Sequence, residues 1–78
     1  MAKQLLMLYG RLGCHLCEDM QTDLLSLQEE LGFELQLIDV DSDPVLVEQY
    51  GTRVPVLASD KGEICYYFLD KQALRRYF

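Results

Sequence analysis

Three patterns in the first half of the chain restrict its fold more than any other feature. Residues 5–9 form a continuous apolar run that ends at Gly10, which is typical of a strand buried on both faces. The next apolar side chains recur at spacings of four, four, three and four residues: Leu16, Met20, Leu24, Leu27 and Leu31. This stripe predicts one helix that ends at Gly32. Residues 33–40 then alternate apolar and polar side chains and predict a second strand.

The second half of the chain predicts a short helix, a hairpin and a final helix. Asp43 and Pro44 form a helix start signal, and this helix should end near Tyr50, before Gly51. Residues 53–59 and 63–69 are apolar runs joined by a turn, so we expect a hairpin in which Tyr66, Tyr67 and Phe68 pack as strand residues. Asp70 is expected to cap a last helix.

The predicted order is therefore β-α-β-α-β-β-α. A strand–helix–strand unit implies a parallel pair, and a hairpin adds antiparallel strands. We expect an α/β fold with one four-stranded mixed sheet flanked by helices. Because 78 residues leave no room for a second core, residues 1–78 should form a single domain.

Charge and hydropathy exclude several classes of function. The formal net charge of -6 disfavours both nucleic-acid binding and membrane-surface binding, because each needs a surplus of Lys and Arg on one face. The apolar run of residues 5–9 is too short for a signal peptide or a membrane span. We expect a cytoplasmic protein, where structural disulfides are rare and close cysteine pairs serve redox chemistry or metal binding.

Two of the three cysteines, Cys14 and Cys17, are separated by two residues at the predicted helix start. Free backbone N–H groups and the helix dipole stabilise a thiolate at Cys14, and Arg11 and His15 add positive charge nearby. Cys17 lies about one turn further along the helix, within reach of Cys14 and more hidden. We therefore predict that Cys14 is the nucleophile and Cys17 the resolving thiol, with His15 as a modulator of the Cys14 pKa.

A second candidate feature is Val54-Pro55 at the start of an apolar strand, where proline removes a ladder hydrogen bond. If this peptide bond is cis, the backbone of Val54 points outward and can pair with an extended substrate. Arg11 and Arg53 stand beside the two motifs, and we expect both to contact the substrate.

Other interpretations of the cysteines remain open. Zinc usually takes four ligands, and only Cys65 remains beyond this cluster, so we expect no metal site and treat Cys65 as a core residue. A dimer that shares an iron–sulfur cluster would also supply four cysteines. A third alternative is a peptide-binding module that keeps the fold without turnover.

The chain resembles the thioredoxin superfamily, and within it the short bacterial glutaredoxin-like proteins. The resemblance rests on Y-G-R-L-G-C-H-L-C after the first strand, on the element order, and on T-R-V-P-V about 40 residues further on. It implies a thioredoxin-like fold, an exposed Cys14 and a cis peptide at Pro55. It also implies a dithiol–disulfide oxidoreductase in which a basic residue at the position of Arg11 helps to hold glutathione.

The chain departs from the family pattern at three places. His15-Leu16 replaces the usual Pro-Tyr between the cysteines, and Leu8 stands where thioredoxins place a buried Asp. After the last strand, glutaredoxins carry Gly-Gly followed by Asp, whereas this chain reads YYFLDKQ. We expect a monomer without a resident cofactor. Its partner is expected to be a disulfide-containing protein or a glutathione-type thiol.

Overall fold

The computed structural model describes residues 4–78 and contains three α-helices, one 3-10 helix and four strands. In chain order these are β1 (Gln4–Gly10), α1 (His15–Leu31), β2 (Phe33–Asp39), η1 (Val40–Ser42), α2 (Pro44–Tyr50), β3 (Val56–Ser59), β4 (Gly62–Tyr66) and α3 (Lys71–Tyr77). The order is the predicted one, with the short helix η1 added between β2 and α2.

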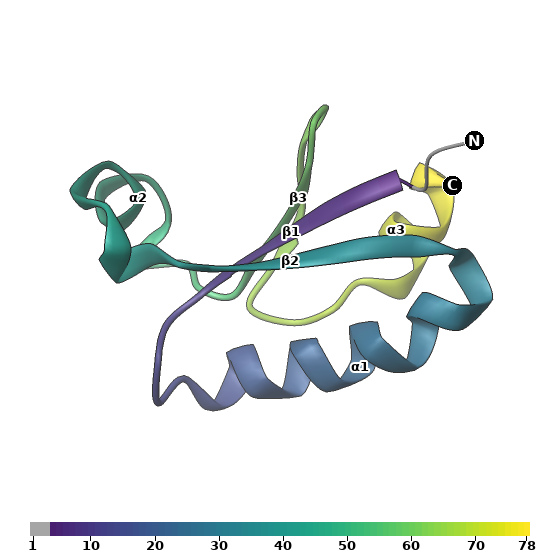
Figure 1. Cartoon of the computed structure of the whole chain (residues 1–78), viewed down its shortest axis with the longest axis horizontal. Coiled ribbons are helices and arrows are strands. Elements are labelled where there is room, and N and C mark those ends of the chain that lie inside the picture. Colours follow the sequence, from purple (N-terminus) through teal and green to yellow (C-terminus); the bar gives the residue numbers. More distant parts are fainter. Residues whose placement is uncertain (1–3) are drawn as a thin grey trace.

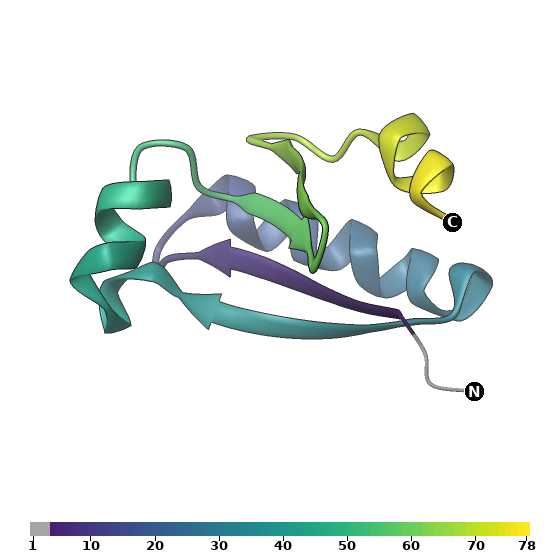
Figure 2. The ribbon, with the colours of Figure 1, turned by 90° about the horizontal axis from the view of Figure 1, so that it is seen from above.

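The strands form one sheet in the order β2-β1-β3-β4. β1 pairs parallel with β2 and antiparallel with β3, and β3 pairs antiparallel with β4. Helix α1 runs along one side of the sheet, while α2 and α3 lie at opposite ends of the molecule (Figures 1 and 2). The predicted α/β fold with a four-stranded mixed sheet is confirmed.

Local signals explain where the helices begin and end. The side chains of Cys14, Asp43 and Asp70 each accept a backbone N–H in the first turn of α1, α2 and α3, respectively. Gly32 ends α1 with a φ of 71°, in the left-handed region, and donates its N–H to the Gln28 carbonyl. Glycine adopts this conformation at little cost, which explains the position of the stop.

The main core lies between the sheet, α1 and α3. Its buried side chains are Leu6, Leu8, Met20, Leu24, Phe33, Leu57 and Leu74. A smaller cluster joins η1, α2 and β3, and consists of Val40, Tyr50 and Val56 with Tyr9 packed against it. The Tyr9 and Tyr50 rings stack with their centroids 4.3 Å apart. This second cluster holds α2 against the strand ends that carry the candidate site.

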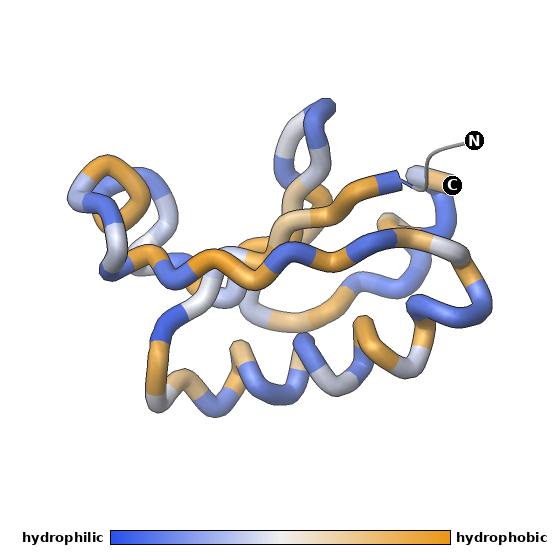
Figure 3. The backbone as a smooth tube through the Cα atoms, in the orientation of Figure 1, coloured by the Kyte–Doolittle hydropathy of each residue, from blue (hydrophilic) through white to orange (hydrophobic). Residues whose placement is uncertain are grey.

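Two sequence predictions about burial are wrong. β1 is not buried on both faces: Leu6 and Leu8 are buried, whereas Leu5 is 41% exposed, because α1 and α3 cover only one face. The hairpin strand β4 ends at Tyr66, so Tyr67 and Phe68 lie beyond it, and Phe68 is 70% exposed. Along β2, which is an edge strand, hydrophilic and hydrophobic residues alternate (Figure 3).

The longest helix, α1, has 17 residues and mixes apolar with charged side chains. Across residues 4–78, no helix combines the length and the apolar character needed to cross a membrane.

Candidate active site

Cys14 is the N-cap residue of α1 and forms a disulfide with Cys17. Its Sγ accepts a hydrogen bond from the Cys17 N–H over 3.1 Å, and its carbonyl accepts the Glu18 N–H. The Cα atoms of the two cysteines are 5.2 Å apart, which is the usual separation for a disulfide. The sulfur of Cys14 therefore takes the place that a Ser or Asp oxygen occupies in an ordinary helix cap.

The two cysteines differ in accessibility. Cys14 is partly exposed, whereas Cys17 is only 8% exposed. The end of β1 approaches Cys17 closely, since a Cβ at Gly10 would lie 3.2 Å from the Cys17 Sγ. A substrate can therefore reach the sulfur of Cys14 more easily than that of Cys17. Their roles as nucleophile and resolving thiol stay predictions, and this geometry is consistent with them.

A pocket of about 330 Å³ lies between the start of α1 and the ends of β1 and β2. Its walls include Cys17, Leu8 and Leu37, and its carboxylates are Glu18 and Asp39. Cys17, although only 8% exposed, therefore forms part of the wall of an open pocket. Sequence reasoning did not find it, because it forms between segments that are distant in the chain.

The Val54–Pro55 peptide bond is cis. Tyr9 pairs with Val56, so the start of β3 lies beside the end of β1, from which the cysteine loop departs. Pro55 is buried and Val54 is half-buried. Among residues 4–78, no partner hydrogen-bonds to the backbone N–H or C=O of Val54. An extended chain placed beside Val54 would find both groups unpaired.

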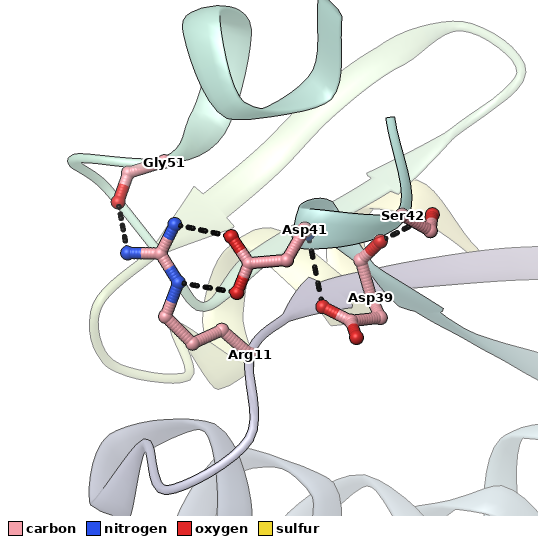
Figure 4. A network of polar contacts seen from close by, with 5 residues as sticks. All are labelled: Arg11, Asp39, Asp41, Ser42 and Gly51. Carbon is pink, nitrogen blue, oxygen red and sulfur yellow. Dashed lines mark hydrogen bonds and ion pairs between the residues drawn. The ribbon is translucent and has the colours of Figure 1, made fainter. Parts of the chain in front are cut away.

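Arg11 ties three segments together beside the cysteine loop (Figure 4). Its Nε and Nη2 donate to both carboxylate oxygens of Asp41, over 3.1 and 2.9 Å, and its Nη1 donates to the Gly51 carbonyl over 3.4 Å. Asp39 in turn accepts the Asp41 N–H over 2.9 Å and so orients that residue. The hydrogen bond to Asp41 raises the pKa of Arg11 further above its ordinary value.

Arg53 is engaged in the same manner by a different carboxylate. Its Nη1 and Nη2 donate to the two oxygens of Glu63 on β4, over 2.7 and 2.9 Å. The guanidinium lies over the rings of Tyr50 and Tyr66, at 5.8 and 5.6 Å from their centroids. Arg11 and Arg53 thus each pair with a carboxylate of the same chain. Their contact with a substrate stays a prediction.

The Arg53–Glu63 pair predicts a pH dependence of stability. The hydrogen bond from Arg53 lowers the pKa of Glu63 below its ordinary value of 4.5. The ionised pair therefore stabilises the fold above pH 4.5, and this contribution is lost as the pH falls through the lowered pKa. We expect Glu63→Gln to lower the melting temperature slightly at pH 7 and to change it less near pH 3. Thermal unfolding of both proteins across this range checks it, and a difference that grows in acid would contradict it.

His15 is the first residue of α1, and its side chain is 93% exposed. Its Nδ1 lies 3.8 Å from a carboxylate oxygen of Glu18, at the outer limit of an ion pair. Its predicted influence on Cys14 stays a prediction. The side chains beside the cysteine pair and Val54-Pro55 that are or can be cationic therefore each have an acidic neighbour. They are Arg11, His15 and Arg53.

Comparison with known proteins identifies the family. Residues 5–78 match the family described as Glutaredoxin-like domain (DUF836). An uncharacterized protein of Mycobacterium tuberculosis, Rv0508, is 37% identical over 87% of this chain and 75% of its own length. The chain belongs to the glutaredoxin-like family.

Solved structures that are similar to this glutaredoxin-like chain show its fold as well as its family. Protein Ne2328 from Nitrosomonas europaea is 41% identical, with a TM-score of 0.90 over 100% of this chain and 94% of that protein. Mitochondrial thioredoxin 3 from Saccharomyces cerevisiae, in its oxidized form, is 24% identical with a TM-score of 0.67 over 99% of this chain and 77% of that protein. The second likeness shows the thioredoxin fold alone. Together with the Cys14–Cys17 disulfide, family and fold support a redox-type role.

Within this glutaredoxin-like fold, Tyr67 occupies the segment where the sequence lacks the expected glycines. Its φ of 65° lies in the left-handed region, which costs a residue with a side chain about 1–2 kcal/mol. Its N–H donates to the Pro55 carbonyl over 2.9 Å, and its hydroxyl donates to the Thr52 carbonyl over 2.8 Å. The two bonds attach the end of β4 to the segment that contains the cis peptide.

Cys65 takes no part in this glutaredoxin-like site. It lies on β4, is half-buried and packs against the main core, in agreement with the predicted core position. Burial raises the pKa of the Cys65 thiol, so less of it is ionised at neutral pH.

Proposed function

We propose that this protein is a dithiol–disulfide oxidoreductase, with Cys14 as the nucleophile and Cys17 as the resolving thiol. The observation that carries the proposal is the helix cap: Cys14 Sγ accepts the Cys17 N–H over 3.1 Å at the first turn of α1. In the reduced protein this N–H group and the positive end of the helix would stabilise negative charge on the Cys14 sulfur. The disposition of a partly exposed Cys14 and a buried Cys17 supports the assignment of roles.

The reaction proceeds in two exchange steps. The Cys14 thiolate attacks one sulfur of a substrate disulfide, forms a mixed disulfide and releases the first substrate thiolate. Cys17 loses its proton and attacks the Cys14 sulfur, which closes the Cys14–Cys17 disulfide and releases the second thiolate. The dithiol loses two electrons, the substrate disulfide gains them, and the protons of the two cysteine thiols end on the products.

The groups around the cysteines support this sequence of steps. The unpaired backbone groups of Val54 can hold an extended substrate beside Cys14 as an added strand. Leu8 supplies no proton acceptor near Cys17, but the pocket that Cys17 lines also contains the Glu18 and Asp39 carboxylates. The proton of Cys17 can therefore pass into this pocket, to water or to one of these carboxylates. An external thiol or dithiol must then reduce the Cys14–Cys17 disulfide before the next cycle.

The test combines turnover with thiol reactivity. With dithiothreitol as reductant, we expect the protein to accelerate reduction of insulin disulfides above the rate with dithiothreitol alone. In the reduced protein, the alkylation rate of Cys14 should rise with a midpoint below the value of about 8.5 for a free cysteine. Cys65 should react later, because burial raises its pKa. Peptide mapping by mass spectrometry separates the three cysteines.

A protein without acceleration, whose Cys14 titrates like a free cysteine, would refute the proposal. The variant Cys65→Ser is the control, since Cys65 packs in the core and is outside the disulfide. It should keep both the turnover and the fast alkylation phase.

A further inference from the structure

We propose that Asp41 and Tyr67 select the substrate class of this site, so that it reacts with disulfides in basic or uncharged polypeptides and disfavours small anionic disulfides such as glutathione disulfide. This inference rests on the proposed function, which it deepens. It starts from the observation that two groups near the cysteines that could hold a carboxylate, the Arg11 guanidinium and the backbone N–H groups just beyond β4, already have partners within the chain.

The guanidinium of Arg11 is the first such group. A guanidinium binds a carboxylate through two parallel N–H bonds, and Asp41 already accepts both of them at 3.1 and 2.9 Å. The third donor of Arg11 goes to the Gly51 carbonyl. Asp39 accepts the backbone N–H of Asp41 and so fixes the backbone position of this residue, whose side chain is 53% exposed (Figure 4). A carboxylate on the substrate would have to displace a charge-assisted pair.

Backbone N–H groups can also hold an anion, and those of the two residues just beyond β4 are the second candidate. The N–H of Tyr67 donates to Pro55 and that of Phe68 donates to the Tyr66 carbonyl, so neither is available to an anion. The Tyr67 hydroxyl closes the segment further by bonding the Thr52 carbonyl. A glycine would adopt the left-handed φ of Tyr67 without strain and would leave the space of its ring open.

The surroundings of Cys14 favour a different ligand. Among the described residues that line the pocket beside Cys17, Glu18 and Asp39 are acidic and Arg11 is the one cation, which Asp41 pairs. The whole chain has a net charge of -6. Leu12, next to the cysteine loop, is 90% exposed, and Phe68, next to the segment bonded to Pro55, is 70% exposed. Acidic groups and exposed apolar side chains match a polypeptide with basic and apolar residues around its disulfide.

The test uses single turnovers of the reduced protein, so that no recycling reductant competes. Three disulfides are compared: a peptide with lysines beside the cystine, a peptide of equal length with glutamates there, and glutathione disulfide. We expect the basic peptide to oxidise the wild-type protein about tenfold faster than either anionic disulfide at low salt, with a smaller ratio in about 0.5 M salt.

The variants Asp41→Asn and Tyr67→Gly should each increase the rate with glutathione disulfide, by about tenfold in combination. Glu29→Gln is the matched control: it removes one negative charge from the exposed face of α1 and should leave all three rates unchanged. If Tyr67→Gly unfolds, Tyr67→Asn replaces it, because Asn tolerates a left-handed φ. Equal rates for the basic peptide and glutathione disulfide in the wild-type protein would overturn the inference and leave the proposed function intact.

A binding measurement separates this inference from failure of the chemistry. S-methylglutathione, which cannot exchange disulfides, is titrated into the oxidised protein and followed by NMR. We expect saturable shifts near Arg11 and residue 67 only in the double variant Asp41→Asn/Tyr67→Gly. Saturable binding to the wild-type protein would refute the inference. If none of the disulfides oxidises the reduced protein, the proposed function fails, and the titration alone decides whether these residues exclude the anion.

Discussion

Replacing Cys17 by serine is expected to convert the protein into a trap for its substrate. Without the second sulfur, the mixed disulfide on Cys14 cannot be resolved within the chain, and turnover should fall about a hundredfold or more. Serine is slightly smaller than cysteine, so it fits the buried position near Gly10. Intact-mass spectrometry after addition of a peptide disulfide should show the chain plus one peptide thiol.

The paired variant Cys14→Ser provides the contrast. It removes the accessible sulfur and retains the buried one, so neither turnover nor a mixed disulfide is expected. The opposite pattern, with adducts on Cys17 in Cys14→Ser, would reverse the assigned roles. Partner capture that persists in Cys14→Ser/Cys17→Ser would favour the peptide-binding alternative.

The second large effect is expected on stability, from Leu24→Ala in the middle of α1. Leu24 is fully buried in the main core, and truncation of such a leucine costs about 2–5 kcal/mol. At about 0.05–0.15 kcal/mol per residue, the 78 residues have a total stability of roughly 4–12 kcal/mol. The variant should therefore unfold at much lower urea concentration, or be partly unfolded without urea. Urea titrations of the reduced proteins, followed by far-UV circular dichroism, measure the difference.

The neighbouring residue supplies a matched control. Leu25 is 52% exposed on the same helix, so Leu25→Ala makes the same chemical change outside the core. We expect it to change the free energy of unfolding by no more than about 0.5 kcal/mol. Similar losses in both variants would mean that α1 packs on the sheet in a different rotation.

These two experiments depend on features that short stretches of sequence predict well. The spacing of apolar residues along α1 indicates its buried stripe, and the positions of Cys14, Asp43 and Asp70 indicate where helices begin. Each signal acts over one helical turn, so it needs no knowledge of the rest of the fold. The same locality explains why a cysteine pair at a helix start is a strong prediction of redox chemistry.

Burial in the sheet was harder to predict, because it depends on what covers each face. A continuous apolar run is compatible with a strand covered on both faces, yet Leu5 is 41% exposed. The apolar run of residues 63–69 led to a similar error, because the predicted strand extends beyond the end of β4. Its aromatic residues suit a strand, but the chain leaves the sheet at Tyr66 and Tyr67 turns into the left-handed region.

The partners of the two arginines show the same limit. Arg11 and Asp41 are 30 residues apart, and Arg53 and Glu63 are separated by a hairpin turn. Nothing in the local sequence distinguishes Asp41 from the other carboxylates of an acidic chain. Only the packing of η1 beside the β1–α1 loop brings it to Arg11.

The sequence by itself therefore determined the order of the strands and α-helices, the helix caps and the cysteine pair, because these depend on periodicity and on contacts within one turn. The tertiary structure alone decided which face of β1 is covered and that the Arg11 guanidinium pairs with the Asp41 carboxylate. It also decided that Tyr67 joins the end of β4 to the segment around Pro55. Those outcomes depend on which distant segments pack together, and that packing also decides which groups around Cys14 remain free for a substrate.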